Sequence, residues 1–139
     1  MPSSKQKLEL VNRWLSRWKP RLLLDKWAVM SKLAEKDPPA RGGLMDMAYI
    51  TVDTTNSEAW LEVCPRLWNE SREYQEASTV HELAHIHTEP VRKLLDKAIR
   101  AGAIDKAEAK DQLEDLTNSI AKIVWAAHKR RPKKTEYHL

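Results

Sequence analysis

The sequence lacks phenylalanine altogether and contains only three glycines and one cysteine among 139 residues. Without phenylalanine, the aromatic part of any core falls mostly to the six tryptophans. The single cysteine, Cys64, excludes an intramolecular disulfide and favours a reducing compartment. Because Cys64 stands beside Pro65 at an expected strand end, we predict a packed thiol rather than a reactive or metal-bound one.

Long apolar runs and a strong excess of charge are also missing. Residues 1–5 lead into a charged amphipathic segment, without a signal peptide or a membrane span, so we expect a cytoplasmic protein with no membrane contact. The formal charge is only +4, and much of it lies in residues 129–134. The rest of the chain is close to neutral, which gives no general case for nucleic-acid binding. Nothing in the sequence indicates an oligomeric state.

Length and composition fit one domain over residues 1–139. Hydrophobic residues make up 42%, which argues against disorder although 32% of the residues are charged. The patterns predict a mainly helical α+β fold. Its expected parts are an N-terminal helical pair at 1–37, a β-hairpin at 44–64, further helices at 70–128 and a basic tail at 129–139.

Two helices are expected before the hairpin. Ser3 is a suitable N-cap for the first, at about 4–18, and Pro20 suits the first turn of the second. The predicted inward stripe of the second helix is Leu23, Leu24, Trp27, Ala28 and Leu33. The tryptophans at helical spacing are expected in the core rather than in a ligand groove, namely Trp14, Trp18 and Trp27.

Prolines and glycines at 36–43 indicate a loop, after which apolar and polar residues alternate. We predict strands at about 46–53 and 59–64, joined by a turn at 54–57. Asn69 or Ser71 is placed to cap the helix that follows.

The helix after the hairpin is expected at about 71–87 and should end by Glu89, because Pro90 follows. A separate short segment over 91–100 would then stop at Gly102. A last helix is expected to begin at about Asp105.

The most informative stretch is His81-Glu82-Leu83-Ala84-His85. On a helix, two histidines four residues apart lie on one face, so one tetrahedral metal can take a nitrogen from each. An acid directly after the first histidine completes the HExxH signature of zinc peptidases, in which it is the general base. A chain of this composition would contain such a match by chance only about 0.015 times. The alternative is a solvated helix that carries these residues by accident.

A second feature lies in the last helix. An apolar stripe is predicted from Leu116, Ile120, Ile123, Val124 and Ala127. Ala121 and Trp125 widen this stripe toward the side of Glu114 and Asn118, which leaves Glu114 as an isolated carboxylate at its margin. Such a carboxylate is costly to bury unless it is paired or bound to a metal.

With these two features, residues 46–127 resemble a minimal gluzincin, a compact zincin-like metallopeptidase domain often found in bacteriophage and prophage sequences. The resemblance implies a zinc ion held by His81, His85 and Glu114 and a catalytic role for Glu82. In gluzincins the third ligand belongs to a Glu-x-x-x-Asp motif, whose acid orients a ligand histidine. Here Asn118 stands at the position of that acid and brings no charge, although it can still accept a hydrogen bond from an imidazole.

Other third ligands remain possible from the sequence, namely Glu89, Glu108 and Asp111. His87 points away from the shared face, so we expect it to pack or to lie on the surface. His128 lies about 20 Å along the last helix from Glu114, too far to share a metal with it.

The expected reaction is hydrolysis of a peptide bond in a peptide or protein substrate. Zinc would activate a water molecule and polarise the scissile carbonyl, while Glu82 takes the proton and passes it to the leaving amine. An edge strand pairs with extended substrate in the family, and the matching residues here are Tyr49, Ile50 and Thr51. The candidates for a donor to the oxyanion are Tyr49, Tyr74 and Tyr137-His138.

Two other classes of function remain open. The chain could be a zincin-like binding or regulatory domain in which a metal only stabilises a small core. Alternatively, the basic residues 129–134 could bind nucleic acid or an acidic partner, or fold back over the cleft. No aromatic residues are interleaved with these charges, which argues against single-strand binding.

Overall fold

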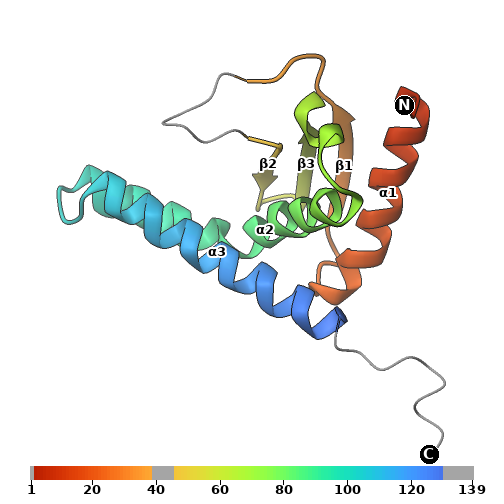
Figure 1. The fold of residues 1–139 in the computed structure, drawn as a ribbon. Helices are drawn as coiled ribbons and strands as arrows, with labels where there is room; N and C mark the ends of the chain where they lie inside the picture. Colours follow the sequence, from red (N-terminus) through yellow and green to blue (C-terminus); the bar gives the residue numbers. More distant parts are fainter. Residues whose placement is uncertain (1, 39–45, 130–139) are drawn as a thin grey trace, which may run out of the picture.

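The computed structural model describes residues 2–38 and 46–129, and its fold is α+β and mainly helical, as predicted (Figure 1). Its elements are α1 (Ser4–Arg21), β1 (Ala28–Leu33), β2 (Ala48–Asp53), β3 (Glu58–Val63), the 3-10 helix η1 (Pro65–Asn69), α2 (Arg72–Arg100) and α3 (Lys106–Lys129). Within the described residues, no helix is long and apolar enough to cross a membrane. The predicted basic tail, Tyr137-His138 and most of the predicted loop at 36–43 lie outside these residues.

The three strands form one sheet in the order β1-β3-β2. The predicted hairpin is confirmed: β2 and β3 are antiparallel, with Ala48 opposite Val63 and Asp53 opposite Glu58. The Asp53 carboxylate accepts hydrogen bonds from the backbone N–H groups of Thr55 and Asn56, which closes the turn. This order leaves β2 at one edge of the sheet.

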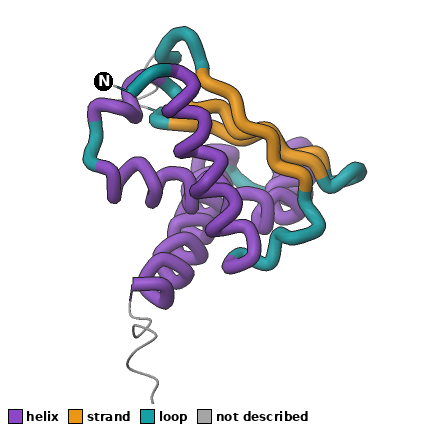
Figure 2. The backbone as a smooth tube through the Cα atoms, turned by 90° about the vertical axis from the view of Figure 1, so that its right-hand side faces the viewer, coloured by secondary structure: helices purple, strands orange, loops and turns teal. Residues whose placement is uncertain are grey.

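The two faces of the sheet differ in what covers them. Side chains of one face join the helices in the core, including Ala59, Leu61 and Val63 of the central strand. Side chains of the other face are exposed, including Met30, Tyr49 and Trp60. The helices therefore lie on one side of the sheet (Figure 2).

Helix α1 begins as predicted. Ser3 caps it, accepting a hydrogen bond from the backbone of Gln6, while the Gln6 side chain accepts one from the backbone of Ser3. Trp14 and Trp18 are buried, which confirms the prediction that they are core residues, and Trp27 packs against the same core. The helix continues to Arg21, so Pro20 lies in its last turn rather than starting a new helix.

The predicted second helix is wrong. Residues 28–33 form β1, which pairs in parallel with β3. The burial of β1 alternates, with Val29 and Leu33 turned toward the core and Ala28 exposed. Leu23, expected in the inward stripe, is 83% exposed and has a positive φ of 58°. Hydrogen bonds to a strand distant in the sequence decide the conformation of this segment, and helical spacing does not reveal them.

Helix α2 carries the HExxH residues and is longer than predicted. Ser71 is its N-cap, accepting a hydrogen bond from the backbone of Tyr74. The helix does not end before Pro90 but runs through it to Arg100, so residues 91–100 are its continuation. Gly102, with φ of 72°, follows the helix end as predicted.

Helix α3 begins after Asp105, whose carboxylate accepts a hydrogen bond from the Glu108 backbone. Its inward face is rotated from the predicted stripe, because Leu116 and Ile123 are 42% and 69% exposed. Ile120 and Val124 of the predicted stripe do pack against the core. Ala121 is buried and Trp125 stacks on Trp18 of α1, on the side where the stripe was predicted to widen, and Thr117 is fully buried beside them. This rotation carries Glu114 toward α2.

Candidate metal centre

His81 and His85 lie one turn apart on α2, as the motif predicts. Their ring centroids are 4.9 Å apart, and the rings meet edge to face at 84°. The neighbours Leu83 and Ala84 are fully buried, which fixes the helix against the core. Because the helix is held on that side, the two imidazoles point toward α3, with 22% and 24% of their side-chain surfaces exposed.

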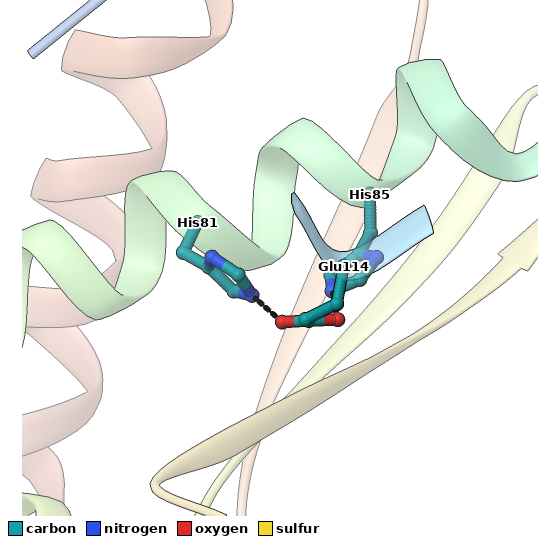
Figure 3. A group of neighbouring side chains, drawn as sticks. All are labelled: His81, His85 and Glu114. Carbon is teal, nitrogen blue, oxygen red and sulfur yellow. Dashed lines mark ion pairs between the residues drawn. The ribbon is translucent and has the colours of Figure 1, made fainter. Parts of the chain in front are cut away.

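Glu114 of α3 completes a group of three donors (Figure 3). Its carboxylate lies between the imidazoles, with one oxygen 2.8 Å from Nε2 of His81 and the other 3.6 Å from Nε2 of His85. One donor atom from each residue lies within 4.8 Å of the others.

These distances suit a small divalent cation. Ligand atoms at about 2.0–2.1 Å from a tetrahedral zinc ion are separated from each other by about 3.3 Å. The two separations from the Glu114 oxygens, 2.8 and 3.6 Å, lie on either side of that value. Both imidazoles therefore lie near coordination distance of the Glu114 carboxylate, and all three donor atoms lie within 4.8 Å of one another. Two imidazoles and one carboxylate are a donor set typical of catalytic zinc, and the half-exposed Glu114 leaves solvent access for a further ligand.

The protonation of the cluster is coupled. Burial lowers the pKa of His81, but the hydrogen bond with Glu114 and the charges of Glu82 and Glu114 together raise it above 6.5. The same hydrogen bond lowers the pKa of Glu114. Burial and the neighbouring charge of His81 lower the pKa of His85. Without a metal, the protonated form of His81 and the ionised form of Glu114 therefore stabilise each other.

Glu82 lies beside the donors but is separate from them. Its carboxylate is 3.9 Å from Nε2 of His81, and only 14% of its side-chain surface is exposed. Burial, with a smaller contribution from the charges of Glu114 and Asp46, raises the pKa of Glu82 to about 8 against the lowering effect of His81. A cation at the donors would lower this pKa and favour the ionised form that a general base requires.

Asn118 lies one turn after Glu114 and next to His81, as expected from the gluzincin pattern. A hydrogen bond with its side chain contributes to raising the pKa of His81. The amide thus contacts a ligand histidine, as the acid of the family motif would, but without a charge.

The alternative third ligands are not part of this group. The Glu89 carboxylate accepts two hydrogen bonds from Nε of Arg92, at 3.0 and 2.9 Å. Glu108 and Asp111 are exposed on α3 and do not join the cluster found among the described residues. His87 contacts the carbonyl oxygen of Leu22, which agrees with its predicted packing role.

The residues predicted to bind substrate lie on β2, which is an edge strand as expected. Ile50 faces the helices, whereas Tyr49 and Thr51 are exposed on the other face of the sheet. A hydrogen bond to Glu62 raises the pKa of Tyr49 to about 12. Because the Tyr49 side chain lies on the face of the sheet opposite the helices, it points away from the donors and cannot stabilise an oxyanion there. Tyr74 is 48% exposed in the first turn of α2.

Some residues near the site were not indicated by the sequence. Asp46 contributes to the electrostatics of Glu82 across a long stretch of chain, and no local pattern reveals it. Thr88 and Thr117 join α2 to α3 through their hydroxyl groups. Their only sequence signal was a polar residue within a largely apolar helix face. Cys64 is buried, as predicted, and burial raises the pKa of its thiol to about 11.

Comparison of the chain with known protein families, curated proteins and solved structures found no match. The resemblance to gluzincins therefore depends on the HExxH motif and on the position of Glu114.

Proposed function

We propose that this chain is a zinc-dependent peptidase of the gluzincin kind, which hydrolyses peptide bonds with an activated water molecule. The observation that carries the proposal is the convergence of His81, His85 and Glu114 from two helices, with a buried carboxylate beside them. Two of the three donor separations, 2.8 and 3.6 Å, are close to those between the ligand atoms of zinc.

The roles of the side chains follow from their positions. Bound zinc supplies a Lewis acid that activates water and polarises a carbonyl group. His81, His85 and Glu114 hold the ion, and Asn118 orients the His81 ring. Glu82, whose carboxylate is 3.9 Å from Nε2 of His81, would accept a proton from the water and deliver it to the leaving amine.

The substrate would be an extended peptide that pairs with β2. The outer edge of this strand has no neighbouring strand in the described sheet, and β2 packs on α2, which carries two of the donors. A peptide added along this edge uses main-chain hydrogen bonds and so places its scissile bond with little dependence on sequence. We assign this role to the backbone of Tyr49, Ile50 and Thr51.

The test is to replace Glu82 by glutamine. Purified wild-type protein is expected to contain one equivalent of zinc and to cleave a fluorescently labelled unfolded protein. Glu82→Gln is expected to retain zinc and to lose roughly a thousandfold in cleavage rate, because the amide cannot accept the proton. Zinc content measured by elemental analysis and cleavage measured by fluorescence separate the two effects.

Glu108→Gln is the matched control, because it makes the same substitution at an exposed residue outside the group of donors. It should leave both zinc content and cleavage unchanged. A wild-type protein that binds zinc, melts at a lower temperature after chelation and cleaves no unfolded substrate would contradict the peptidase proposal and favour a metal-stabilised binding domain.

A further inference from the structure

Two buried threonines form a side-chain hydrogen bond between α2 and α3. The hydroxyl oxygens of Thr88 and Thr117 are 3.0 Å apart, and the two residues are 2% and 0% exposed. We propose that this pair is a positioning device that holds the Glu114 carboxylate at the two imidazoles and thereby sets metal affinity. The proposal rests on the metal centre proposed above.

Each threonine lies one turn beyond a metal-ligand residue. Thr88 follows His85 by three residues, and its hydroxyl is 3.2 Å from the His85 carbonyl oxygen. Thr117 follows Glu114 by three residues, and its hydroxyl is 3.0 Å from the carbonyl oxygen of Leu113. The contact therefore joins the turn of α2 that carries His85 to the turn of α3 that carries Glu114.

The available protons allow a direct link between the helices. Each threonine hydroxyl contacts a carbonyl oxygen of its own helix, and the two hydroxyls also contact each other. Each hydroxyl has one proton. One threonine can therefore donate to its carbonyl oxygen while the other donates to the hydroxyl oxygen of the first threonine. A buried hydroxyl pair satisfied in this way has a defined direction, unlike the apolar contacts around it. It can therefore fix how far one helix slides along the other.

Glu114 depends on such a constraint because packing restrains it little. Half of its side-chain surface, 51%, is exposed, whereas the imidazoles that it meets are mostly covered. The place of its carboxylate is set by the place of α3 on α2. Figure 1 shows that the two helices run side by side near their connection and separate toward the other end of α3. A directed contact between them restricts this spacing.

The experiment is the substitution Thr117→Val, which keeps the shape of the side chain and removes the hydroxyl. Thr88 can still donate to the His85 carbonyl, so no buried polar group loses its partner. We expect zinc affinity, measured by competition with a chromophoric chelator, to fall about tenfold. The visible absorption of the cobalt-substituted protein should also change, because it reports the geometry of the donors.

Thr79→Val is the matched control. Thr79 is 1% exposed on the same helix, and its hydroxyl donates to the carbonyl oxygen of Gln75 within α2. This variant should keep the zinc affinity and cobalt spectrum of the wild type, whatever its effect on melting temperature. Thr117→Ser should also keep both, because it retains the hydroxyl, although loss of the methyl group lowers stability.

The outcomes separate the two proposals. Wild-type protein that binds neither zinc nor cobalt contradicts the metal centre. If the wild type binds and Thr117→Val binds equally well with the same spectrum, the positioning role alone is wrong. A second measurement uses Thr88→Val and the double variant that combines it with Thr117→Val. The double variant should lose no more zinc affinity than either single variant, because each of the three proteins lacks the same hydrogen bond.

Discussion

The two halves of α2, before and after Pro90, belong to one helix but have different surroundings. In the first half, Val80, Leu83 and Ala84 are at most 1% exposed. In the second half, Val91 and Leu94 are 38% and 66% exposed. Only the first half carries the histidines and Glu82. The comparison shows that the proposed metal donors of α2 lie on the half whose neighbours are buried in the core, whereas the other half packs mainly along α3.

Pro90 marks the change without ending the helix. It lacks the N–H that would donate to the Ile86 carbonyl, which in a helix interior costs about 3 kcal/mol or more. The helix nevertheless continues, because its second half packs along α3 and its Leu95 and Ile99 are half-buried. Tertiary contacts thus offset a local penalty.

The largest expected difference between neighbouring positions concerns metal binding. His85→Ala should weaken zinc binding by roughly a thousandfold or more, because it removes one of three donors. His87→Ala, two residues further along, should leave affinity unchanged, since His87 contacts the Leu22 carbonyl instead. Isothermal titration with zinc measures both. Equal losses for the two variants would show that the donors are not those assigned.

The next largest difference is expected in the free energy of unfolding, between substitutions in the first and second halves of α2. Leu83→Ala should lower the free energy of unfolding by about 3 kcal/mol, since Leu83 is fully buried. Leu94→Ala makes the same deletion in the exposed half and should cost less than about 0.5 kcal/mol. Urea denaturation of metal-free protein gives both values. Similar losses of unfolding free energy at the two positions would mean that the Leu94 side chain is buried in solution.

The smallest effect is a pH dependence of zinc binding, which is expected from the histidines of the first half. His81 must lose its proton to bind zinc, and its pKa is raised above 6.5, so affinity should fall as pH drops through that raised pKa. The slope should be about tenfold per pH unit. It should become steeper only below the lowered pKa of His85, where a second proton competes. Affinity that stays constant as the pH falls below the raised pKa of His81 would contradict this protonation scheme.

The sequence predicted those parts of the molecule that local spacing determines. The Ser3 cap, the hairpin and the pairing of His81 with His85 each depend on residues a few positions apart. Glu114 was predicted to join them through the family pattern, and the structure brings it there.

The remainder depends on contacts between distant segments. Residues 28–33 have helical spacing but form β1, because β3 offers a partner for the backbone. The predicted stripe of α3 followed its most apolar residues, yet the buried line passes through Thr117. The partner of Thr117 across the interface is Thr88, and Thr88 belongs to a segment near a predicted helix end, so the sequence did not indicate the contact. The sequence also did not predict that α2 continues past Pro90, because the contacts with α3 that support this continuation join distant segments.

The connection between α2 and α3 consists of only five residues, 101–105. Closing so short a loop costs little chain entropy, whereas pairing β1 with β3 must bring together strands separated by β2 and the two connections that flank it. The three donors all lie on this helical hairpin. During refolding we therefore expect the helical hairpin to bring the donors together early, before the parallel strand joins the sheet.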